Sequence, residues 1–76
     1  MITLEDIRVK ISEAIKQSGM TNTEIARRIG IRHQQISCYV NGQKMPALDT
    51  FAKLCAVLDI DANEILCVAD YETEDN

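Results

Sequence analysis

Two predicted helices in the middle of this chain are unusually short, and this limits what the chain can fold into. Apolar residues recur at helical spacing after Thr21, but Gly30 ends the pattern after about two turns. A second short helix begins near Arg32 or His33 and ends at Asn41-Gly42. Helices of this length are unstable alone and must pack against other elements. The pattern therefore favours a compact all-α domain.

Three further helices complete the predicted architecture. The first spans residues 4–18 and ends at Gly19, while a capping signal at Asp61 opens a short helix near the end of the chain. A fourth helix follows Pro46, and we expect it to bury one apolar face, made of Leu48, Phe51, Leu54, Cys55 and Leu58. Residues 1–69 thus form one five-helix domain, and residues 70–76 form an acidic tail.

The two short helices have the geometry of a helix-turn-helix motif. A tight glycine turn joins them, and the small Ala26 lies where they cross closely. Thr21 and Glu24 fit a capping box, in which the Thr21 hydroxyl accepts from the Glu24 N–H and the Glu24 side chain reaches back. Arg27 and Arg28 are expected on the exposed face of the first short helix, and Tyr39 in the core.

The charge of the chain is distributed unevenly. Its net charge is −4, but residues 1–46 hold seven basic and four acidic residues and therefore carry +3. Residues 47–76 hold one basic and eight acidic residues and carry −7. Such a chain can present a positive face despite its acidic composition, because the local field governs docking more than net charge does.

Several classes of protein are disfavoured. Charged residues interrupt every apolar run, so we expect no signal peptide, no membrane contact and a cytoplasmic location. The three cysteines, Cys38, Cys55 and Cys67, lack metal-binding spacing and are expected to be free thiols. His33 has no second ligand spaced to join it, and Cys38 has no recognisable base. We therefore expect no metal, no cofactor and no enzyme activity.

The segment from Thr21 to Gly42 resembles the phage-repressor/Cro-like (XRE-type) helix-turn-helix family. The resemblance extends over residues 7–66, and its marks in register are Glu24-Ile25-Ala26, Gly30, Ile36, Asn41-Gly42, Pro46 and Leu58. It implies a five-helix, lambda-repressor-like domain that binds double-stranded DNA as a small transcriptional regulator, in the simplest case a repressor. The third helix, about residues 33–41, would lie in the major groove.

Carried over position by position, the resemblance implies two sets of DNA contacts. The positions that contact base edges or nearby phosphates are Arg32, His33, Gln34, Ser37 and Cys38. The positions that contact phosphate are Thr21, Asn22, Asn41 and Lys44. The side-chain chemistry agrees independently, because Gln34 can pair with adenine and Arg32 with guanine. Helical periodicity also places most of the first set on one face.

The chain departs from the family pattern at several of these positions. Many members have an arginine at the position of Ile15 and a glutamate at that of Val40, so a hydrophobic contact is expected here in place of an ion pair. Arg32 takes the place of a Ser or Thr cap and cannot cap a helix in that way. Asn22 is one methylene shorter than the common Gln, and Cys38 favours a thymine-methyl contact.

Other functions and the assembly stay open from sequence alone. The chain can also be an antitoxin or a restriction-modification controller, or a protein-interaction module that has lost DNA binding. We expect a weak homodimer formed through an apolar C-terminal surface, with Ile60, Ile65, Leu66 and Val68 as candidates. No small-molecule effector is expected.

Overall fold

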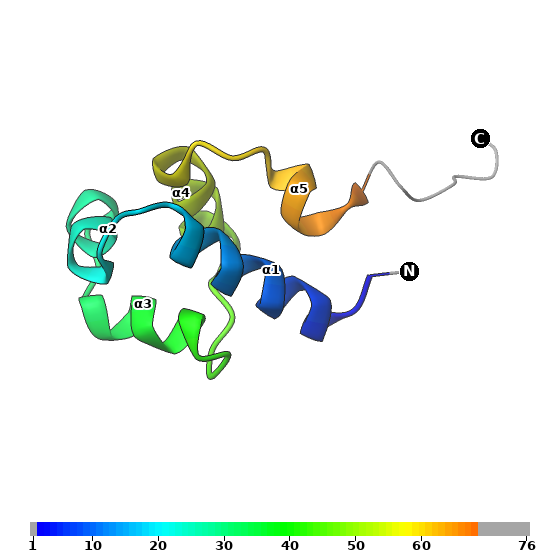
Figure 1. Cartoon of the computed structure of the whole chain (residues 1–76), viewed down its shortest axis with the longest axis horizontal. Coiled ribbons are helices and arrows are strands. Elements are labelled where there is room, and N and C mark those ends of the chain that lie inside the picture. The colour runs from blue at the N-terminus through cyan, green and yellow to red at the C-terminus, as the bar shows by residue number, and fades with distance from the viewer. Residues whose placement is uncertain (1, 69–76) are drawn as a thin grey trace, which may run out of the picture.

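Residues 2–68 are described by the computed structural model of this chain, and they fold into five α-helices without a strand. The helices appear in chain order in Figure 1: α1 Leu4–Gln17, α2 Asn22–Ile29, α3 His33–Val40, α4 Leu48–Leu58 and α5 Ala62–Leu66. Their bounds confirm the predicted all-α fold. The expected acidic tail, residues 70–76, lies outside the described residues.

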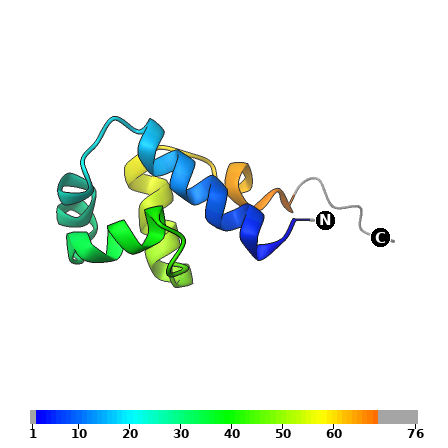
Figure 2. The same ribbon diagram turned by 60° about the horizontal axis from the view of Figure 1, so that its bottom comes forward.

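The short helices α2 and α3 lie together at one end of the molecule. Figures 1 and 2 both place the start of α1 and the end of α5 at the opposite end. The longer α1 packs against both α3 and α5, and α4 packs against α2. This arrangement leaves one side of α3 without a covering helix (Figure 2).

Local signals set most of the helix ends. The Thr21 hydroxyl accepts from the Glu24 N–H at 3.1 Å, and Asp61 caps α5 by accepting from the Asn63 N–H at 3.0 Å. Gly30 ends α2 with φ 91°, a left-handed conformation that a residue without a Cβ adopts easily. These ends agree with the sequence. A capping box between Thr3 and Asp6 at the start of α1 was not predicted.

One half of the predicted capping box at α2 is wrong. The Glu24 carboxylate does not reach back to the Thr21 N–H, because it accepts hydrogen bonds from Arg27 and Arg28 instead. Charged donors bind a carboxylate more strongly than a neutral backbone amide does, which accounts for the choice.

The core gathers one face from every helix. Its buried residues are Ile11, Ile15, Ile25, Ala26, Ile29, Ile36, Tyr39, Phe51, Leu54, Cys55 and Ile65. The prediction was wrong for Leu48, which is 84% exposed. Helical side chains point toward the helix N-terminus, so a residue in the first turn of α4 points past the packed part of the helix.

Candidate nucleic-acid interface

The outer side of α3 carries the predicted base-contacting residues. Arg32, His33 and Gln34 are exposed, while Ser37 and Cys38 are half-buried. The opposite side is anchored in the core by Ile36 and Tyr39. Arg32 forms no side-chain cap at the start of α3, as predicted. The five residues therefore share one accessible surface at the uncovered side of α3.

A hydrogen bond joins the two predicted contact sets. Asn22 Nδ2 donates to Ser37 Oγ at 3.3 Å, so the start of α2 is tied to the middle of α3. The two residues are 15 positions apart, and no local sequence signal indicates this pairing. The bond also occupies part of the hydrogen-bonding capacity of both side chains. We infer that Asn22 helps to position α3.

Thr21 caps α2 and can also donate a hydrogen bond. Its oxygen accepts from the Glu24 N–H, and a hydroxyl that accepts in this way still has a hydrogen to donate. Thr21 is exposed at the N-terminus of α2, where the helix dipole favours negative charge. Both features suit a phosphate contact.

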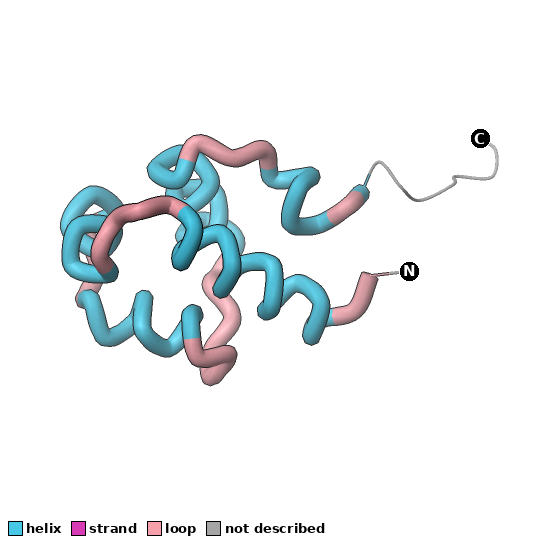
Figure 3. Tube along the Cα trace, viewed as in Figure 1, coloured by secondary structure: helices cyan, strands magenta, loops and turns pink. Residues whose placement is uncertain are grey.

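The loop after α3 carries the last two predicted phosphate contacts. Figure 3 shows this loop between α3 and α4. The backbone N–H groups of Gln43 and Lys44 donate to the Cys38 carbonyl at 2.9 and 3.4 Å, which folds the loop onto the last turn of α3. Asn41 and Lys44 are both exposed there. The fold thus brings all nine predicted site residues to α2, α3 and their adjoining turns.

The sequence prediction missed how Arg27 takes part in this surface. Arg27 lines an open groove of about 500 Å³ together with Arg32, His33 and Gln34. Its guanidinium and that of Arg28 are bound to Glu24, as described above. The spacing of the three residues, i, i+3 and i+4 on one helix, is a sequence signal from which this cluster was predictable.

Burial keeps two titratable core residues, Tyr39 of α3 and Cys55 of α4, uncharged at neutral pH. Burial raises the pKa of the Tyr39 hydroxyl above its usual value near 10, and electrostatic interactions with Cys38 and Asp49 raise it further. Burial likewise raises the pKa of the Cys55 thiol, with a smaller contribution from Asp61. All three cysteines are free, as predicted.

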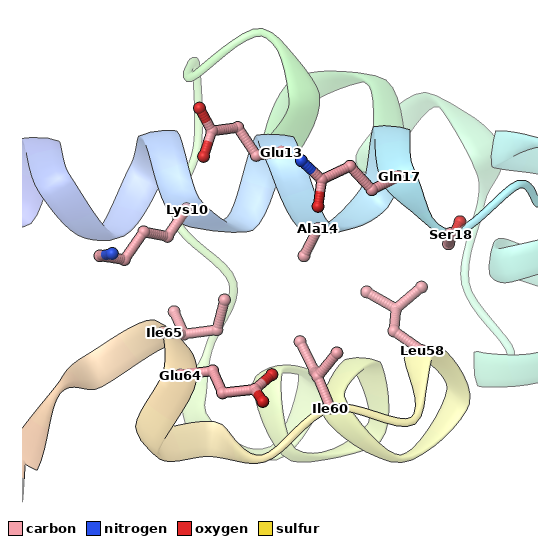
Figure 4. Close-up of a pocket in the computed structure, with 9 residues that line it drawn as sticks. All are labelled: Lys10, Glu13, Ala14, Gln17, Ser18, Leu58, Ile60, Glu64 and Ile65. Carbon is pink, nitrogen blue, oxygen red and sulfur yellow. The ribbon is translucent and has the colours of Figure 1, made fainter.

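A second groove lies far from α3, between α1 and α5. It encloses about 350 Å³, and Figure 4 shows Ile60 and Ile65 pointing from the α4–α5 side toward Ala14 of α1. Within residues 2–68 no group of His, Cys, Asp or Glu could hold a metal ion. No helix in that part of the chain is long and apolar enough to cross a membrane.

Comparison with known proteins decides the family. A family model described as Helix-turn-helix matches residues 11–65, which is more than two thirds of the chain. The chain belongs to the XRE-type helix-turn-helix family. This is a family of DNA-binding transcription regulators. Searches of curated proteins and of solved structures gave no match.

The matched residues span the whole of α2, α3 and α4 and parts of α1 and α5. The matched residues include all nine predicted contact positions.

Proposed function

We propose that this XRE-type protein binds double-stranded DNA sequence-specifically and represses transcription, with α3 in the major groove. The observation that carries the proposal is the uncovered polar side of α3, where Arg32, His33 and Gln34 are exposed next to the start of α2. The side chains of Arg32, His33 and Gln34 can form hydrogen bonds with the donors and acceptors on base edges. Repression needs no further contact, because a protein bound over a promoter excludes polymerase.

The nine predicted residues divide between two tasks in this proposal. Base edges are contacted from α3 by Arg32, His33, Gln34, Ser37 and Cys38. Phosphates are contacted from the flanking turns by Thr21, Asn22, Asn41 and Lys44. Phosphate contacts fix the register on the duplex, and base contacts provide the sequence preference. The Asn22–Ser37 hydrogen bond links the two sets directly.

We further propose that the protein docks as a weak homodimer on a pseudo-palindrome whose half-sites lie about one helical turn apart. The apolar surface for this contact is smaller than the sequence indicated, because Ile65 is only 4% exposed and belongs to the core. Ile60 and Leu66 are half-buried against the core, which leaves Val68, 60% exposed, as the best remaining candidate. A contact this small is consistent with a weak dimer that is stabilised when both subunits bind the same DNA.

Selection from a random pool of duplexes, followed by footprinting, tests the proposal. We expect an enriched sequence with two-fold symmetry and a protected region over both halves. If each dimer neutralises about 6–8 phosphates, log K should fall against log salt with a slope of about −5 to −7. A pool that shows no enrichment, together with affinity that is independent of salt, would contradict the proposed function.

A further inference from the structure

An acidic side chain holds two arginines on the exposed side of α2. Oε2 of Glu24 accepts from Arg27 Nη2 and from Arg28 Nε, each at 2.7 Å. Oε1 accepts from the same Arg27 nitrogen at 2.9 Å. Distances this short are typical of charge-assisted hydrogen bonds. One carboxylate therefore engages both arginines of α2.

Arg27 lies beside predicted base-contacting residues at the start of α3. Its side chain is 69% exposed and lines the groove that also contains Arg32, His33 and Gln34 at the start of α3. When the second helix of such a motif enters the major groove, the first helix crosses the DNA backbone. Arg27 then lies where a phosphate passes, but with its charge already paired.

We propose that Glu24 limits sequence-independent DNA binding by holding Arg27 and Arg28 in ion pairs within α2. The inference rests on the proposed function and makes Glu24 a residue that sets the strength of sequence-independent binding without contacting a base. A guanidinium bound to Glu24 has part of its charge neutralised and one of its nitrogens already donating, so it gains less from a phosphate than an unpaired arginine does. The base contacts from α3 do not depend on this pairing.

The effect on affinity follows from how binding to random DNA and binding to a cognate site arise. Binding to random DNA comes almost entirely from phosphate neutralisation. Binding to a cognate site adds base contacts to the same phosphate contacts. The pairing of Arg27 and Arg28 with Glu24 therefore weakens binding to random DNA and to a cognate site alike. Base contacts then contribute a larger share of the binding free energy at the cognate site. The pKa of Glu24 is lowered by its hydrogen bonds from Arg27 and Arg28, so the carboxylate stays ionised at neutral pH.

The test compares Glu24→Gln with Glu64→Gln in the full chain. Glu64 is exposed on α5 and lines the groove against α1, so its substitution removes the same charge away from α2 and α3. Binding of each variant to heparin and to random duplex DNA is measured against salt concentration. Glu24→Gln should bind both polyanions about 3–10-fold more tightly at 100 mM salt, with a salt dependence steeper by about 1–2. Glu64→Gln should show a clearly smaller change.

A triple variant identifies the cations responsible. Adding Arg27→Gln and Arg28→Gln to Glu24→Gln should return heparin and random-DNA affinity to within about twofold of the original protein. Equal gains for Glu24→Gln and Glu64→Gln would overturn the inference, since net charge alone would then explain them. A gain that survives in the triple variant would overturn it as well.

A second measurement applies if thermal unfolding shows that Glu24→Gln does not fold. Arg27→Gln in the otherwise unchanged chain should lower random-DNA affinity by less than about twofold, because Arg27 contributes little while it is paired. A loss of tenfold or more would overturn the inference. Failure of the proposed function would be distinguishable, because the unchanged protein would then show no preference for any DNA sequence. The heparin comparison would still decide the role of Glu24 in that case.

Discussion

Gln34 offers the sharpest test at the scale of single residues. It is exposed near the start of α3, and its amide can form two hydrogen bonds with an adenine. Gln34→Ala should lower the affinity for the selected site by about 1–3 kcal/mol and relax preference at one base pair. Competition binding with single-base variants of the site measures both effects. Equal losses on selected and random DNA would contradict base reading by Gln34.

Asn41 should behave differently from Gln34. It is exposed after the last turn of α3, where the predicted contact is to phosphate. Phosphates carry no sequence information, so Asn41→Ala should weaken binding to every duplex by a similar factor. The same competition series measures this. A change in base preference for Asn41→Ala would show that its side chain reaches a base edge.

The lowered pKa of Glu24 predicts how the stability of the fold changes at low pH. Its pKa is lowered below the usual value of 4.5 in the folded state, so the unfolded chain binds the proton more tightly than the folded chain does. The resulting stabilisation is complete above the usual pKa and is lost as the pH falls through the lowered one. The urea midpoints of the original protein and Glu24→Gln should therefore differ at pH 7, and this difference should be smaller at pH 3. A difference that is unchanged at pH 3 would contradict the ion-pair origin.

Among the contacts between helices, the one between α1 and the end of α3 most affects the candidate interface. Ser12 Oγ donates to the Val40 carbonyl at 2.8 Å, which ties α1 to the last turn of α3. Ile15 of α1 is buried in the core, and Val40 packs partly buried against the core. These positions are consistent with the expected hydrophobic contact between the two helices.

A double-mutant cycle tests whether Ile15 and Val40 meet. Ile15→Arg alone should destabilise the fold by about 3–5 kcal/mol, because it leaves a buried charge without a partner. Adding Val40→Glu should recover much of that loss through an ion pair between α1 and α3. Urea unfolding of the four proteins gives the coupling free energy. A coupling near zero would show that the two side chains are not in contact.

At the scale of the whole molecule, Val68 and Leu48 are two of the exposed apolar residues through which a dimer could form. Val68 lies after α5, and Leu48 lies at the start of α4. We expect Val68→Ser to raise the dimer dissociation constant severalfold in sedimentation experiments, and Leu48→Ser to leave it nearly unchanged. The reverse result would place the two-fold contact at α4 and contradict our assignment.

The charge polarity of the chain leads to a further expectation. Asp70, Glu72, Glu74 and Asp75 place four negative charges after residue 69. A chain that ends at Ala69 should bind DNA at least as tightly as the full chain, because four like charges no longer oppose the phosphates. Gel-shift titration of both chains at low and high salt measures the difference. Weaker binding by the shorter chain would contradict a purely electrostatic effect.

What the sequence determined by itself is local. Thr21, Gly30 and Asp61 act on backbone groups within a few residues, so the helix ends near them were predictable, as was the exposed side of α3. The tertiary structure decided the features that depend on distant neighbours. Burial of Ile65, exposure of Leu48 and the Asn22–Ser37 bond follow from which helix covers which face, and helical periodicity alone does not contain that information.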